Sequence, residues 1–99
     1  MTNLEYATAA AEAALLAADK AQAIAEAAQL VQNGVALGFL AQAAQDMADE
    51  SASHWEAICG WENDKDKNLA FRVSLADEAC TAATGAAIFV GDLAANSIA

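Results

Sequence analysis

The sequence contains no proline, and large apolar side chains are scarce in it. Only 25 of the 99 residues are Leu, Ile, Val, Phe, Met, Trp or Tyr, whereas 30 are alanine. Proline is the residue that most strongly interrupts helices, and alanine is the strongest helix former. Residues 1–99 therefore predict a single all-α domain. Because burying an alanine methyl removes little apolar area from water, we expect much of the stabilisation to come from contacts between subunits.

Positive charge is also scarce. Four basic residues face 14 acidic ones, which gives a formal net charge of -10. Such a surface repels phosphate, so neither nucleic acid nor an anionic membrane is an expected partner. Copies of the chain also repel one another at neutral pH, and that repulsion falls as carboxylates take up protons. The charge balance therefore predicts an assembly that responds to acid.

Targeting and membrane-spanning signals are lacking as well. The N-terminus has no basic segment followed by an apolar one, so it does not resemble a secretory signal. The uncharged stretch 27–45 carries five Gln or Asn residues, and the uncharged stretch 79–91 is too short to span a bilayer. An integral membrane partner is therefore not expected. Two cysteines without a signal sequence favour reduced thiols over a disulfide, although the sequence does not decide their redox state.

The pattern predicts two or three long alanine-rich helices, arranged as a hairpin or extended, over about 3–33, 35–61 and 68–97. Asn3 and Asn68 are the expected N-caps, and Asn33-Gly34 is the expected left-handed C-cap of the first helix. Whether the chain turns back at Gly34 or continues as one long rod stays open. Segments 71–75 and 88–90 resemble strands, but their alanine-rich surroundings favour helix.

The first helix carries one acidic stripe and two apolar stripes, each at intervals of seven residues. Because seven residues are nearly two helical turns, each stripe runs along one side of the helix. The acidic stripe is either a solvated face or a charge-tuned contact, and its members are Glu5, Glu12, Asp19 and Glu26. The two apolar stripes predict coiled-coil-like packing with a close approach at alanine. One contains Leu16, Ala23 and Leu30, and the other contains Ala17, Ile24 and Val31.

The second helix shows alternating steps of three and four residues, which predict one packing seam. The seam consists of Leu37, Leu40, Ala44, Met47, Ser51, His54, Ile58 and Trp61. Trp55 and Trp61 are interpreted as packing anchors, with a partner or lipid contact as the alternative.

Candidate chemical sites are few. Asp64, Asp66 and Asn68 are spaced like the start of a calcium loop, but Leu69 and Leu75 stand where that loop needs a glycine and a bidentate acid. His54 and Cys59 are five residues apart, which does not place both on one helix face as metal ligands. We therefore predict no metal, cofactor or catalytic residues, and no enzymatic activity.

Two segments resemble R-body (killing-trait) structural proteins of bacteria. They are ALGFLAQA, residues 36–43, and AATGAAIFVGD, residues 82–92, and they cover about a fifth of the chain. The resemblance implies a subunit of a rolled protein ribbon in the bacterial cytoplasm. In that family the ribbon extends on acidification and is associated with killing, and a related small subunit is an implied partner.

These features together predict a non-enzymatic structural subunit that self-assembles into a polymeric ribbon, filament or sheet. The candidate assembly contacts are Ala9, Ala13, Leu16, Ala23, Leu30, Leu37, Leu40, Trp55 and Trp61. The candidate pH-tuning groups are Glu5, Glu12, Asp19, Glu26 and His54. The alternative is a small acidic helical adaptor that binds one protein partner through Leu37, Leu40, Met47, Ile58 and the two tryptophans.

Overall fold

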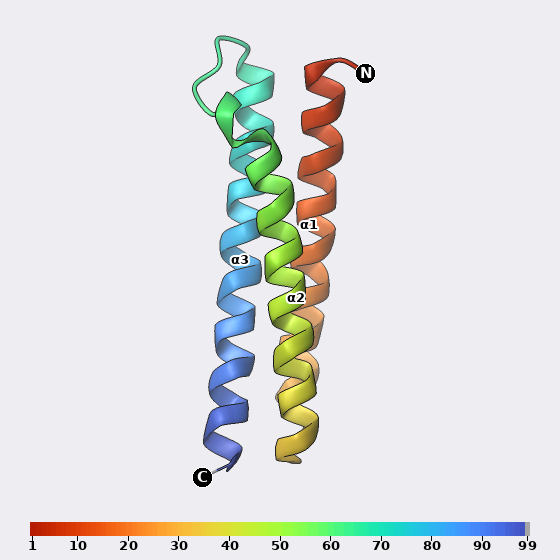
Figure 1. Cartoon of the computed structure of the whole chain (residues 1–99), viewed down its shortest axis with the longest axis vertical. Coiled ribbons are helices and arrows are strands. Elements are labelled where there is room, and N and C mark those ends of the chain that lie inside the picture. Colours follow the sequence, from red (N-terminus) through yellow and green to blue (C-terminus); the bar gives the residue numbers. More distant parts are fainter. Residues whose placement is uncertain (99) are drawn as a thin grey trace.

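In the computed structural model, which describes residues 1–98, the chain forms three long helices that run in alternating directions (Figure 1). They are α1 (Asn3–Ala28), α2 (Gly34–Ile58), which continues into a short 3-10 turn η1 (Cys59–Trp61), and α3 (Lys67–Ile98). Each helix packs against both of the others, in a rod of 51 by 20 by 15 Å. The all-α prediction is confirmed.

The turn between α1 and α2 differs from the prediction. Helix α1 ends at Ala28 rather than at residue 33, and Asn33 is the N-cap of α2 with φ at -76°. The Asn33 side chain accepts hydrogen bonds from the backbone N–H groups of Val35 at 2.9 Å and Ala36 at 3.2 Å. These bonds satisfy two of the first N–H groups of α2, which otherwise lack helical partners. The chain therefore turns back as a hairpin and does not continue as a rod.

The other two predicted caps also lie too late in the sequence. Thr2 rather than Asn3 caps α1, because its hydroxyl accepts the Glu5 N–H at 3.1 Å while the Glu5 carboxylate accepts the Thr2 N–H at 3.4 Å. This reciprocal pair is a capping box. At α3 the Asn68 N–H donates to the Asp66 carboxylate at 2.9 Å, so Asp66 performs the capping that was predicted for Asn68.

The two strand-like segments, 71–75 and 88–90, both lie within α3, as their alanine-rich surroundings predicted. Their β-branched and aromatic residues divide between the two sides of the helix. Val73 and Val90 are buried, whereas Phe71, Ile88 and Phe89 are exposed. Helical periodicity therefore overrides the local strand propensity in both places.

The core is made mainly of alanine. Among the described residues, 17 of the 22 buried apolar side chains are alanine, and the five larger ones are Leu37, Ile58, Leu69, Val73 and Val90. Alanine-lined helices approach one another closely, because there is little side-chain bulk between them. The core is therefore thin, and it extends along the whole rod.

One hydrogen bond fixes how α1 and α2 are aligned. The buried Ser51 hydroxyl donates to the Ala14 carbonyl at 3.1 Å. Moving one heptad along each helix in opposite directions places Ala21 beside Ala44, then Ala28 beside Leu37, and at the other end Ala7 beside Ile58. The middle of the rod thus contains only small buried residues, and the larger ones close its two ends.

Candidate assembly surface

Of the two apolar stripes predicted on the first helix, the one that contains Leu16 lies on the outside of the bundle. In the other, Ala17 is buried, and Ile24 and Val31 pack against the core. Leu16 is 56% exposed, and Ala9 and Ala23 are exposed in the same row of α1. Leu30, which is 87% exposed, continues the seven-residue spacing in the turn after the helix. Ala13 is half-buried beside α2. The four exposed residues, Ala9, Leu16, Ala23 and Leu30, therefore contribute little to packing within the bundle. They remain available for contacts with another molecule.

A different row of α1 packs against α2 and α3. It repeats with alternating steps of four and three residues and consists of alanine alone: Ala7, Ala11, Ala14, Ala18, Ala21, Ala25 and Ala28. This row was not predicted from the sequence, because the packing face was located from the larger apolar side chains. The signal that identifies the row is its unbroken alternation of four-residue and three-residue steps between alanines.

The acidic stripe is a solvent-facing edge of α1. Glu5, Glu12, Asp19 and Glu26 are all exposed, and they lie between the buried alanines and the outward apolar row. Within residues 1–98 no Lys or Arg lies within 4.0 Å of a carboxylate, and the one contact of this kind joins His54 to Glu50 at 4.0 Å. The negative charge of the monomer is therefore not neutralised by internal ion pairs.

The predicted seam of α2 is largely correct. Leu37, Ala44, Ser51 and Ile58 are buried, and the members between them are half-buried: Leu40, Met47, His54 and Trp61. The prediction omitted Ala48, which is also buried. Because Leu37 and Ile58 are enclosed by the protein's own helices, two of the residues proposed for an adaptor surface are inaccessible to a partner.

The two tryptophans pack against the protein's own core. The Trp61 ring makes an edge-to-face contact with Tyr6 at the start of α1, with ring centroids 6.2 Å apart and an interplanar angle of 89°. Such aromatic pairs add modestly to the stability that burial provides. Trp55 is half-buried, and its indole Nε1 has no hydrogen-bond partner in the described part of the chain. Both residues close the end of the bundle near η1.

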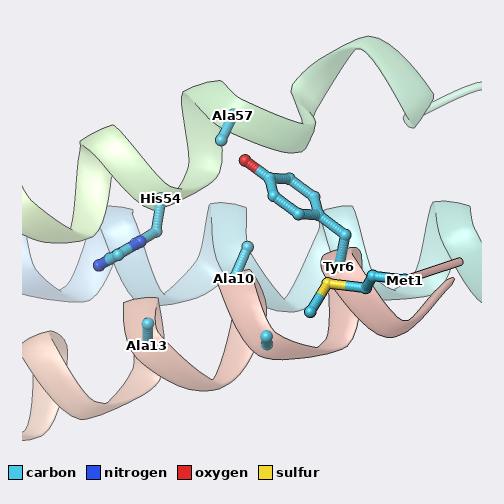
Figure 2. Close-up of a pocket in the computed structure, with 7 residues that line it drawn as sticks. Met1, Tyr6, Ala10, Ala13, His54 and Ala57 are labelled. Carbon is cyan, nitrogen blue, oxygen red and sulfur yellow. The ribbon is translucent and has the colours of Figure 1, made fainter. Parts of the chain in front are cut away.

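A shallow groove of about 340 Å³ lies between α1 and α2 at the same end. Figure 2 shows the Tyr6 ring leaning across it, with the hydroxyl directed toward Ala57 and with His54 farther along α2. The remaining lining residues are Met1, Ala9, Ala10 and Ala13, so the surface is mostly hydrocarbon. His54 is 35% exposed and has the Glu50 carboxylate on the next turn of α2. This groove places no nucleophile beside the histidine.

The acidic loop before α3 uses its side chains to shape the backbone. Asp64 accepts the Asp66 N–H at 2.9 Å, and Asp66 in turn accepts the Asn68 N–H. Across the described residues, no three His, Cys, Asp or Glu side chains converge as metal ligands would. Cys59 and Cys80 are both free and half-buried.

Helix α3 meets the length and hydropathy criteria for a membrane span, because an 18-residue window within Lys67–Ser97 has a mean hydropathy of 1.3. The uncharged stretch 79–91 lies within this longer apolar helix. About two-fifths of the window, 39%, is buried against α1 and α2. A core helix of a globular protein satisfies the same criteria, so this property alone carries little weight.

The distribution of side-chain size between core and surface is unusual. Alanine dominates the core, whereas ten larger apolar side chains are exposed: Met1, Tyr6, Leu15, Leu16, Leu30, Val35, Phe39, Phe71, Ile88 and Phe89. Single exposed apolar residues are common in proteins, but many on one small domain are typical of an interaction surface.

No protein-family model, curated protein or solved structure matches the chain.

Proposed function

We propose that this protein is a non-enzymatic structural subunit that self-assembles into a polymeric ribbon, filament or sheet in the bacterial cytoplasm. Its main partner is a further copy of itself, with a related small subunit as a second partner, as the R-body resemblance implies. The observation that carries the proposal is that small apolar side chains fill the core while large ones lie on the surface. Of the 22 buried apolar residues 17 are alanine, and ten larger apolar residues are exposed.

The energetics support association. Apolar burial contributes roughly 25 cal/mol per Å², so a core of alanine methyls uses little of the apolar area that this chain carries. Leu16 exposes apolar area on the outer row of α1, beside Ala9 and Ala23, and Leu30 exposes more in the turn directly after the helix. When two such rows meet, the leucines are buried and the alanines allow the helices to approach closely. Assembly therefore supplies burial that the monomer lacks.

Replacing Leu16 and Leu30 together by glutamate is expected to abolish assembly through α1. The double variant places charge in the row that we propose to be buried, where an unpaired carboxylate is strongly disfavoured. Sedimentation velocity should then give smaller species, down to the 10.1 kDa monomer, where the wild type gives large ones.

The matched control replaces Gln22 and Gln29 by glutamate. Gln22 is exposed on α1 and Gln29 is exposed at its C-cap, and the changes add the same two charges outside the apolar row. The control should assemble nearly as the wild type does. Equal loss of assembly in both variants would mean that net charge, rather than the apolar row, controls association.

Acid is expected to promote assembly or to change its form. The stripe of Glu5, Glu12, Asp19 and Glu26 borders the apolar row and is exposed, so copies that meet there bring like charges together. Acid neutralises carboxylates and thereby removes this repulsion. Light scattering and negative-stain microscopy between pH 7 and pH 4 should detect the change. An assembly that keeps its size and form over this range contradicts the acid response.

A further inference from the structure

The outward side of α1 carries a second heptad seam, in which acidic and apolar residues alternate. Successive members are separated by four and three residues in turn, without a break. Within the helix the members of this outer seam are Glu5, Ala9, Glu12, Leu16, Asp19, Ala23 and Glu26, and Leu30 continues the spacing in the turn after the helix. All of them are exposed. Because this spacing keeps its members on one side of a helix, α1 presents a coiled-coil seam to the outside as well as an alanine row to the inside.

Neither α2 nor α3 covers the outer seam. The buried alanines of α1 lie on the opposite side of the helix, where the other two helices pack. Leu16 in the seam is 56% exposed, and Leu15 on its flank is 39% exposed. Among residues 1–98, no Lys or Arg lies within 4.0 Å of a seam carboxylate. Both the apolar area and the negative charge of the seam are therefore available to another molecule.

The charge of the seam determines which helix fits it. Helix α1 carries four acidic residues, all of them in the seam, and one basic residue, Lys20. In heptad terms Lys20 occupies the flank opposite Leu15 and lies outside the seam itself. Two copies that met through this seam at neutral pH would each bring four carboxylates into one contact, where like charges repel and loss of water is costly. A helix with Lys or Arg at the facing positions replaces that repulsion by attraction.

We propose that at neutral pH the outer seam binds a basic amphipathic helix of a second protein. That helix carries Lys or Arg at one seam position of each heptad and a large apolar residue at the other. The inference rests on the proposed function, which makes this side of α1 a contact surface, and it names the partner that the surface takes while its carboxylates are charged. A second copy competes better as acid neutralises the same carboxylates.

Each kind of seam member contributes to the fit. Leu16 and Leu30 offer apolar area that the apolar residues of the partner bury. Ala9 and Ala23 leave room for the long hydrocarbon stems of lysine or arginine. The carboxylates recur every seven residues, so they pair with bases that recur every seven residues. Polar pairs at seam positions fix the register of two helices and exclude partners that lack the matching charge.

A synthetic helix tests the proposed partner. The probe is a fluorescein-labelled peptide of about four heptads with Lys at one seam position and Leu at the other. The control peptide has the same composition in an order that breaks the seam. Fluorescence anisotropy with the full chain at pH 7 and physiological salt should show saturable binding of the seam peptide, and binding about tenfold weaker for the control. Equal binding of the two peptides overturns the proposal, because net charge alone then accounts for the attraction.

A pair of double variants locates the binding surface. Glu12→Gln with Asp19→Asn removes two charges from the outer seam and should weaken binding of the seam peptide about tenfold. Asp46→Asn with Asp49→Asn removes the same charge from exposed positions of α2 and should weaken it less than about twofold. Equal loss in the two double variants, or no loss in either, overturns the outer seam as the binding surface.

Sedimentation velocity of the chain without peptide separates this inference from the proposed function. Self-assembly of the wild type without preference for the seam peptide overturns the basic partner and leaves the proposed function intact. Large assemblies that exclude the seam peptide at pH 7 assign the outer seam to a second copy and likewise overturn the basic partner. A wild type that remains monomeric at every concentration and pH overturns the proposed function, whether or not the peptide binds.

Discussion

Replacing Ile58 by alanine is expected to destabilise the bundle by about 2–5 kcal/mol. Ile58 is 1% exposed and is the largest of the fully buried side chains. It lies at the end of the rod where Ala7 of α1 occupies the same layer, and the methyl group of Ala7 cannot fill the space that the substitution leaves. The cost combines lost burial with an unfilled cavity. Urea unfolding should show a lower midpoint, and Tm should fall by about 10 °C or more.

The control for this prediction is Ile88→Ala, the same chemical change at a position that is 60% exposed. At a concentration where the protein is monomeric, it should change the stability by about 0.5 kcal/mol or less. If Ile58→Ala is equally mild, the end of the bundle is less tightly packed than the burial of Ile58 indicates. The comparison separates core packing from any general effect of losing an isoleucine.

Replacing Ala21 by leucine is expected to cost about 1–3 kcal/mol, even though leucine is larger, apolar and a good helix former. Ala21 and its neighbour Ala44 are both 0% exposed, as is Ala83 at a similar distance along α3. A layer of three alanines leaves no room for the added carbon atoms, so the helices must separate. Separation loosens contacts in the adjoining layers, which also contain alanine.

Ala82→Leu is the matched control for Ala21→Leu, because Ala82 is exposed on α3. The substitution there should leave the unfolding free energy nearly unchanged in the monomer. A stabilising effect of Ala21→Leu in thermal unfolding would contradict the close approach of the three helices in the middle of the rod. It would indicate that the layer contains unfilled space.

The helical architecture was predictable because composition and period agree along most of the chain. The hairpin between α1 and α2 was not, because the Asn33-Gly34 pair suits either the end of one helix or the start of the next. Two N–H groups, of Val35 and Ala36, find their acceptor in the Asn33 side chain, and this decides the matter in favour of the start of α2. The sequence alone does not reveal whether Asn33 ends the first helix or caps the second.

The packing face of α1 was harder to identify for a physical reason. Hydrophobic periodicity locates a core only where apolar and polar residues alternate, and alanine occupies nearly every side of this helix. Leu16 and Leu30 were therefore the most visible apolar signal, yet both lie outside the bundle. In a core this narrow, size complementarity selects the row that contains alanine alone. The larger residues are left for the surface.

The proposed assembly is consistent with an alanine packing row. Because alanines form the face of α1 that packs within the monomer, Leu16 and Leu30 have few neighbours from their own chain. The acidic stripe then separates the inner row from the outer one and limits association at neutral pH. The same residues that misled the search for the core are the ones to which we assign the contact between subunits.

Sedimentation velocity of the wild-type protein over a wide concentration range tests the central claim most directly. The proposed function predicts species far larger than the 10.1 kDa monomer, growing as concentration rises and as pH falls from 7 toward 4. A single monomeric boundary at the highest concentration and at every pH in that range, from protein that circular dichroism reports as helical, would contradict it.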